Sequence, residues 1–245
     1  GDEKGTPSFL GEGDRSSLAS WVSYNLSSVY LGPGEQKEVV YTITVPTTAT
    51  PGGYYAGLLF TTEKPGDDGI GVAGAVGPLV LVTVQGQVVE SGVVKRFSAS
   101  QDSKTSLPVD FNVLFANSGT IHVKPAGVIR ITNMFGKTVG VIPVNQEGGN
   151  VLPRSSRSFD ATWQKTAMPE NSSELMREWR NFGLGPYTAT LVMNYGSTDE
   201  VVTTTASFWV MPWMLIVLFA ILLVALALLL TQYNKWIIKQ SKKKK

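Results

Sequence analysis

Residues 210–230 read VMPWMLIVLFAILLVALALLL and contain no charged side chain. A helix rises about 1.5 Å per residue, so a run of this length matches a hydrocarbon core of about 30 Å. Pro212 stands at the start of the run, where the backbone N–H that proline lacks costs a helix little. The run predicts a transmembrane helix over residues 209–234, and a buried core helix is the alternative.

Aromatic and basic residues flank this run and indicate its ends and its orientation. Lysines crowd the C-terminal side, whereas no Lys or Arg lies between Arg180 and the run. Lysine-rich flanks stay in the cytoplasm and attract anionic lipid headgroups. We therefore expect residues 1–208 to face outward from the plasma membrane and residues 235–245 to form a basic cytoplasmic tail. The expected anchors at the two membrane–water interfaces are Trp209, Trp213, Tyr233, Trp236, Lys235 and Lys239.

The composition limits what the outward part can do. Six of the 21 basic residues follow the apolar run, which leaves 15 basic against 19 acidic residues before it. A weakly acidic surface of this kind does not favour nucleic acid. Cysteine is absent, so packing must hold the domains together even in an oxidising compartment. An outward N-terminus requires a secretory signal, which the first residues do not contain, so we expect a processed or truncated chain.

Two domains are expected before the membrane. Residues 1–20 are rich in Gly, Ser, Asp and Glu and predict a loop or a poorly ordered terminus. Residues 21–90 then show the alternation of apolar and polar residues that is typical of strands, separated by turns such as Gly32-Pro-Gly-Glu35. Predicted strands in this first domain cover residues 39–45, 54–62 and 79–84.

Residues 91–208 repeat this rhythm and predict a second β-sandwich. Its last strand runs into the apolar run with almost no linker, so this domain should stand close to the bilayer in a restricted orientation. Predicted strands cover residues 109–116, 128–133, 138–144, 158–163, 187–195 and 201–210.

A short helix is predicted over residues 171–182, inside the second domain. Leu175, Trp179 and Phe182 recur at the spacing of one helical face, with Asn171 or Ser172 as a possible N-cap and Gly183 as a stop. Leu175, Trp179 and Phe182 are candidate contacts to a partner, because an insertion of this length exceeds what joining two strands requires. The alternative is that the helix forms a lid over its own sandwich.

No motif points to catalysis, a metal or a cofactor. Residues 69–74 fit G-x-G-x-x-G, but a strand rather than a helix is expected after them, which favours a loop. His122 is the only histidine, and it is more typical of a structural residue than of a catalytic one. The acidic pairs Asp67-Asp68 and Asp199-Glu200 fall in predicted loops, where a calcium site is a weak alternative to simple solvation.

Several turn motifs resemble a known family. The first domain carries Leu31-Gly-Pro-Gly-Glu35 and, over residues 49–56, ATPGGYYA, which resemble the immunoglobulin-like domains of bacterial surface proteins. The second domain adds Phe115-Ala-Asn-Ser-Gly119 and Gly185-Pro-Tyr187 before the helix and the lysine tail. This arrangement resembles the membrane-anchored WxL-interacting (peptidoglycan- or host-binding) proteins of Gram-positive bacteria. The resemblance implies tandem immunoglobulin-like sandwiches, binding to a cell-wall or surface partner, and no catalytic residue.

The chain departs from that pattern by its inserted helix and by a first domain without opening strands. Only about four or five strands can be placed between Trp21 and Gly86, while an immunoglobulin-like sandwich needs roughly seven. We expect the missing strands to come from residues that precede residue 1 in the natural chain or from a partner that adds a strand.

The sequence thus predicts an all-β protein with two tandem immunoglobulin-like sandwiches and one transmembrane helix. It indicates a single-pass, non-enzymatic surface protein without cofactors, which binds membrane lipid through its anchor and a protein or cell-wall partner through its outer domains, as in adhesion. The alternative function is an accessory structural subunit of a larger membrane complex.

Overall fold

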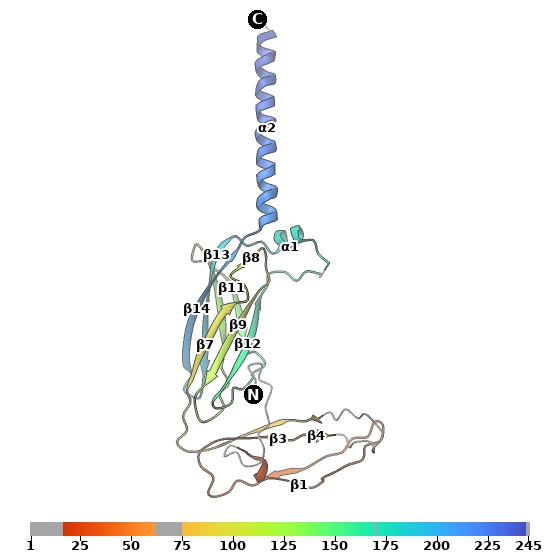
Figure 1. Cartoon of the computed structure of the whole chain (residues 1–245), viewed down its shortest axis with the longest axis vertical. Coiled ribbons are helices and arrows are strands. Elements are labelled where there is room, and N and C mark those ends of the chain that lie inside the picture. Colours follow the sequence, from red (N-terminus) through yellow and green to blue (C-terminus); the bar gives the residue numbers. More distant parts are fainter. Residues whose placement is uncertain (1–16, 62–74, 170, 244–245) are drawn as a thin grey trace.

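A computed structural model describes residues 17–61, 75–169 and 171–243, with side chains described as far as residue 237. Figure 1 shows three parts in a row: a region of short strands at one end, a β-sandwich in the middle, and the long helix α2 (Trp213–Lys243) at the other end. We call residues 17–61 and 75–90 the N-terminal region. It lies at the end of the sandwich that is opposite to α2.

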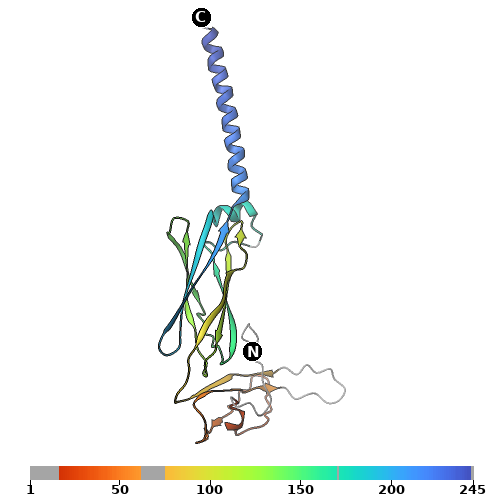
Figure 2. The same cartoon turned by 60° about the vertical axis from the view of Figure 1, so that its left-hand side comes forward.

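The sandwich packs a five-stranded sheet, in the order β11-β10-β13-β14-β8, against a three-stranded sheet in the order β12-β9-β7. Figure 2 shows the two layers from the side. Neighbouring strands are antiparallel except for β8, which pairs parallel with the end of β14. The strands are β7 (Gly92–Ala99), β8 (Ser103–Lys104), β9 (Val109–Asn117), β10 (Ala126–Asn133), β11 (Thr138–Val144), β12 (Ser155–Trp163), β13 (Gly185–Tyr195) and β14 (Glu200–Val210).

The sandwich core follows from alternation along these strands. In β13 every second residue from Gly185 to Tyr195 is buried, as expected when successive side chains point to opposite faces of a sheet. Near the α2 end, the ring of Phe208 lies 5.4 Å from that of Phe111, 5.6 Å from Tyr187 and 6.1 Å from Trp163, measured between centroids. This aromatic cluster fills the core at the α2 end of the sandwich.

All six strands predicted for this domain are present, and their bounds differ by a few residues at most. The strands β7 and β8 were not predicted. A register shift between Val94 and Arg96 interrupts the alternation of β7, so its period-two pattern is broken in the sequence. β8 has only two residues, which is too short for any periodic signal.

The N-terminal region differs from the sandwich in that its strands form three separate two-stranded sheets, β1–β2, β3–β6 and β4–β5, among the residues described. The predicted strand over residues 39–45 is shortened to β2, and the one over residues 54–62 is divided between β3 and β4. Its elements are a 3-10 turn at Ala19–Trp21 and the strands β1 (Val22–Tyr24), β2 (Tyr41–Ile43), β3 (Gly52–Gly57), β4 (Phe60–Thr61), β5 (Ala75–Val76) and β6 (Leu79–Val84).

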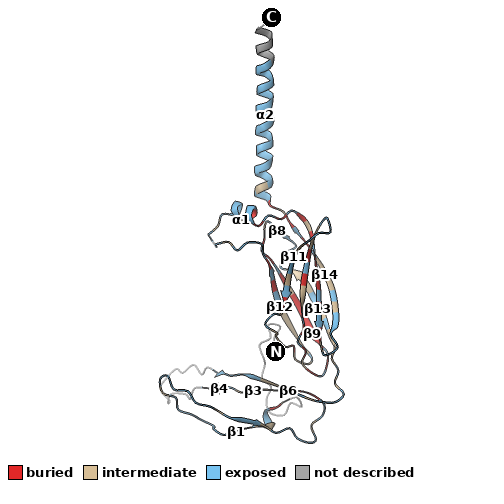
Figure 3. Ribbon diagram, turned by 180° about the vertical axis from the view of Figure 1, so that it is seen from behind, coloured by how far each residue is buried: buried red, intermediate tan, exposed pale blue. Residues whose placement is uncertain are grey.

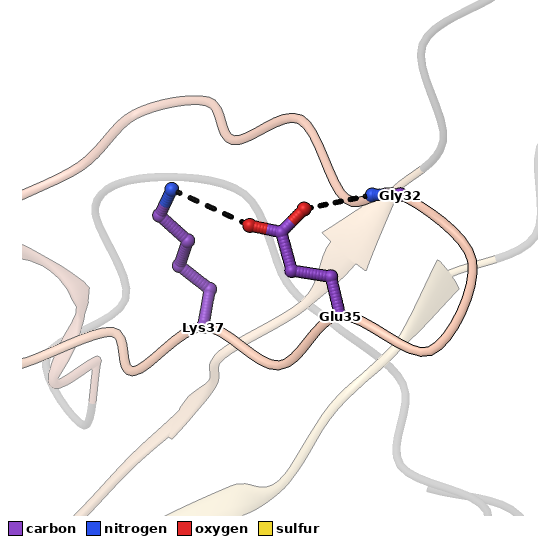
Figure 4. A network of polar contacts seen from close by, with 3 residues as sticks. All are labelled: Gly32, Glu35 and Lys37. Carbon is purple, nitrogen blue, oxygen red and sulfur yellow. Dashed lines mark hydrogen bonds and ion pairs between the residues drawn. The ribbon is translucent and has the colours of Figure 1, made fainter.

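The predicted Gly32-Pro-Gly-Glu35 turn is confirmed (Figure 4). The backbone N–H of Glu35 donates to the carbonyl of Gly32 at 3.0 Å, and the Glu35 carboxylate accepts the Gly32 N–H, also at 3.0 Å. Gly34 has φ +77°, a conformation that glycine adopts without strain. Lys37 Nζ lies 3.9 Å from the Glu35 carboxylate.

The helix α2 is the one helix in the described residues that is long and apolar enough to cross a membrane, over Trp213–Ile237. Figure 3 colours most of its described residues as exposed, so it is not packed on the rest of the chain. It begins at Trp213, not at residue 209 as predicted, because β14 continues to Val210. It also ends beyond residue 234. Trp209 is therefore a strand residue just before the helix.

Candidate functional site

The predicted inserted helix is present but shorter, as α1 (Glu174–Arg180). Ser173 is its N-cap and accepts the backbone N–H of Met176 at 3.4 Å, so the predicted caps Asn171 and Ser172 are wrong. The helix ends at Asn181 rather than at Gly183. A serine side chain that accepts an N–H three residues ahead is the ordinary way to begin a helix.

Hydrogen bonds of Asn181, whose side chain is buried, hold α1 against the sandwich. The Asn181 amide accepts the backbone N–H of Thr166 at 3.0 Å and donates to the carbonyl of Thr166 at 3.2 Å. Lys165 adds a hydrogen bond from Nζ to the carbonyl of Phe182 at 2.6 Å. These bonds tie α1 to the segment that follows β12.

Hydrogen bonds of Glu178 also connect α1 to α2. This side chain is only 1 % exposed, and its two carboxylate oxygens accept the backbone N–H groups of Met214 at 3.3 Å and Leu215 at 2.9 Å. The first N–H groups of a helix have no partner within the helix, and negative charge is favoured at that end. Glu178 therefore caps α2 from another element. The sequence reasoning missed this residue, because nothing local links it to a helix start 36 positions away.

The three predicted partner contacts are exposed to solvent beside these hydrogen bonds. Trp179 is 71 % exposed, and Leu175 and Phe182 are also exposed. These three side chains do not cover the sandwich core, as a lid would require. α1 packs instead through Glu178 and Asn181.

Other exposed apolar side chains share this end of the molecule. Gly185 pairs with Val210, and Asn133 pairs with Tyr187. These pairs bring the β10–β11 turn, the start of β13 and the end of β14 to the same end of the sandwich. We call the exposed apolar residues there the membrane-end collar: Met134, Phe135, Trp179, Phe182, Trp209 and Trp213. Trp209 and Trp213 are the predicted anchors on this side, while Tyr233, Lys235 and Trp236 lie in the last third of α2 with Lys239 four residues after Lys235.

A second exposed apolar surface lies on the N-terminal region. Within its described residues only Leu18, Gly52, Gly53 and Tyr54 are buried. Both strands of a two-stranded sheet are edge strands, and edge strands can accept further strands. The outer side of β3 is already partly paired, since the Leu18 N–H donates to the carbonyl of Tyr55 at 3.0 Å. We call the exposed apolar residues of this region the distal surface: Tyr24, Leu26, Tyr30, Leu31, Val40, Tyr41, Val45, Leu59, Phe60, Val76 and Leu79.

The N-terminal region joins the sandwich at the loop after β9. The Gly53 N–H donates to the carbonyl of Thr120 at 3.2 Å, and the Tyr55 hydroxyl lies 3.3 Å from His122 Nδ1. Burial raises the pKa of Tyr55 to about 12, a shift that a hydrogen bond with the backbone of His122 reduces, and burial lowers the pKa of His122 from 6.5. His122 thus lies at the junction between the N-terminal region and the sandwich, and the expectation that its role is structural stays a prediction.

The remaining sequence motifs add no chemistry to these surfaces. The glycine motif at residues 69–74 and the pair Asp67-Asp68 lie outside the described residues. Asp199 forms part of the β13–β14 turn, where its carboxylate accepts the Asn194 amide at 3.2 Å. Across the part of the chain that the structure describes, no three His, Cys, Asp or Glu side chains are grouped as metal ligands would be.

Comparison with known proteins assigns no family. No family model matches the chain, and no curated protein matches it.

Proposed function

We propose that this chain is a single-pass surface protein of the plasma membrane, with the N-terminal region outside the cell and the C-terminus in the cytoplasm, and that the distal surface binds a surface-protein or cell-wall partner. One observation carries the proposal. Within the described residues, three two-stranded sheets and a set of exposed apolar side chains lie at the end farthest from α2, the helix that is long and apolar enough to cross a membrane.

The sandwich acts as a spacer in this proposal. β13 and β14 each have 11 residues, so the sandwich separates the distal surface from the start of α2 by about 35 Å. That distance carries the distal surface well beyond the lipid headgroups and toward the cell wall. The strand orders β12-β9-β7 and β11-β10-β13-β14-β8 support an immunoglobulin-like sandwich, and they support the proposed relation to WxL-interacting proteins only at the level of architecture.

The chemistry of the distal surface favours a protein segment in extended conformation. A strand added to an open sheet edge gains backbone hydrogen bonds, while alternate side chains of the segment enter apolar contacts. An isolated two-stranded sheet is marginal in water, so each sheet of the N-terminal region would be stabilised by such an addition.

The proposal can be tested by amide hydrogen exchange on the full chain in lipid nanodiscs, with and without surface-protein extract or peptidoglycan fragments. We expect slower exchange in β1, β2 and β6 when the protein partner is present. The substitutions Leu31→Lys and Val40→Lys should abolish this protection, whereas Val141→Lys should preserve it, because Val141 is similarly exposed but lies on β11 of the sandwich. Unchanged exchange with every addition would contradict the proposal.

The alternative function, an accessory subunit of a larger membrane complex, is supported by the membrane-end collar, which places aromatic side chains beside α2. Purification in mild detergent separates the two. Stoichiometric integral-membrane partners that remain bound through α2 and the collar would favour the subunit, and a partner lost on Leu31→Lys would favour distal binding.

A further inference from the structure

We infer that the membrane-end collar lies in the headgroup layer of the outer leaflet, so that the sandwich rests on the lipid surface in one orientation instead of swinging about α2. This inference rests on the proposed insertion of α2 in the membrane. It assigns a lipid-binding surface to α1 and the β10–β11 turn, two elements that lie outside the membrane span itself.

The first observation that supports this inference is the height of α1 relative to the membrane. Glu178 bonds to the N–H groups of Met214 and Leu215, so α1 lies level with the first turn of α2. One helical turn is about 5.4 Å, which is close to the depth of the headgroup layer outside the hydrocarbon core. Figures 1 and 2 both show α1 lying across the base of α2. An inserted α2 therefore brings Trp179 to the lipid surface.

The second observation is that the connection between β14 and α2 is short and held by hydrogen bonds. Only Met211 and Pro212 lie between β14 and α2, and Pro212 is buried. The backbone N–H of Met211 donates to the carbonyl of Lys104 at 2.8 Å, and Glu178 holds the next turn. With both sides of this junction held, the sandwich cannot move away from the membrane without breaking these bonds.

The chemistry of the collar carries the third step. Tryptophan is enriched at membrane–water interfaces because its ring is apolar while its N–H can still meet a polar partner. Phe135, at the tip of the β10–β11 turn, is 83 % exposed, which is unusual for a phenylalanine in contact with water only. Basic side chains outnumber exposed acidic ones at this end of the molecule. The basic residues are Lys104, Lys137, Lys165, Arg177 and Arg180, and the exposed acidic residues are Asp102, Asp110 and Glu174. Basic side chains around an apolar collar match anionic headgroups.

A cysteine-free chain allows the contact to be measured position by position. Single cysteines are introduced in the full chain as Phe135→Cys, Trp179→Cys and Gln146→Cys, each labelled with an environment-sensitive fluorophore and reconstituted in phosphatidylcholine–phosphatidylglycerol vesicles. Gln146 is the control, because it is exposed in the turn after β11, at the opposite end of the sandwich. A fourth variant, Leu222→Cys, reports on the middle of α2.

We expect nitroxide lipids labelled at the headgroup to quench the fluorophores at positions 135 and 179 several-fold more than the one at position 146, with aqueous iodide giving the reverse order. Lipids brominated deep in the acyl chains should quench position 222. Labels at 135 and 179 that remain as open to iodide as 146, while 222 is quenched, would overturn the collar inference and leave the anchor intact. An unquenched label at 222 would overturn both.

The effect of the whole collar is measured in a second experiment that does not depend on labels at its own residues. Phe135→Ser combined with Trp179→Ser should increase the rotational freedom of a label at position 146 relative to the vesicle. The control, Val141→Ser combined with Val201→Ser, removes two other exposed apolar side chains, which lie on strands of the sandwich, and should leave that freedom unchanged. Equal effects of the two pairs would contradict the inference.

Discussion

The carboxylate of Glu178 accepts the backbone N–H of Leu215 at 2.9 Å, so a short helix of the sandwich domain caps the first turn of α2. The two residues belong to elements that are separated by all of β13 and β14. The bond couples the direction of α2 to the orientation of the sandwich. It therefore restricts the angle between them.

Glu178→Ala should loosen this joint. Loss of a helix cap costs about 1–2 kcal/mol, and the junction would then sample a wider range of angles between α1 and α2. The measurement is the width of the distance distribution between spin labels at positions 146 and 222, by double electron–electron resonance. Glu174→Ala, on the exposed face of the same helix, is the control and should leave the distribution narrow. An unchanged width in Glu178→Ala would show that the cap does not hold the angle.

Trp179→Ala should separate a docking role of α1 from a structural one. Because the side chain is mostly exposed, its removal should change the free energy of unfolding of the sandwich by no more than about 0.5 kcal/mol. Phe208→Ala, in the aromatic cluster, should cost about 3–5 kcal/mol. Thermal denaturation of both variants tests this expectation, and a large loss of stability in Trp179→Ala would support the lid instead.

Asn117→Ala should destabilise the loop that joins the sandwich to the N-terminal region. The buried Asn117 amide donates to the carbonyls of Ile121 at 2.8 Å and Val151 at 2.9 Å, and it accepts the Gly119 N–H at 2.8 Å. Leaving these backbone groups unpaired should cost about 2–4 kcal/mol. Chemical denaturation is the measurement.

Asn194→Ala is the control for that experiment, because Asn194 is an exposed residue of β13 with one hydrogen bond to Asp199. Its loss should change the free energy of unfolding much less than the loss of Asn117. Equal effects would mean that the buried network is not a main support of the loop.

The junction at His122 should weaken in acid. Burial lowers the pKa of His122 below 6.5, so below pH 6.5 the unfolded chain takes up a proton more readily than the folded one. The stabilisation is thus complete above pH 6.5 and is lost as the pH falls toward the folded pKa. Because His122 is the only histidine, NMR titration of histidine-labelled protein reports its pKa without assignment. A pKa at or above 6.5 would contradict this account, and His122→Gln should remove the pH dependence of protease cleavage at residues 85–91.

The topology should follow the lysine bias. Protease added to intact cells should remove the outer domains and leave an epitope at the C-terminus protected, because lysine-rich flanks remain in the cytoplasm. The control is the same digestion after permeabilisation, which should destroy the epitope. Outer domains that survive digestion of intact cells, and are cleaved only after permeabilisation, would reverse the orientation.

The sequence alone determined the parts of this protein whose signals are local. Residues 213–230 are apolar without interruption, and only a helix satisfies every backbone group in lipid, so a membrane-length helix follows from composition and length. The strands β9 to β14 follow from apolar residues at every second position and from turn residues between them. The helix α1 was also visible as a periodic pattern, with ends that were uncertain by a few residues.

The tertiary structure alone decided how these parts meet. Glu178 caps α2 because chain reversal through β13 and β14 returns the polypeptide to the same end of the sandwich, a coincidence in space that no sequence period encodes. The same long-range pairing gathers Phe135, Trp179 and Trp209 from distant segments into one collar. In the N-terminal region, alternation predicted strands but not which edges would pair, because pairing depends on the neighbours that pack against each sheet.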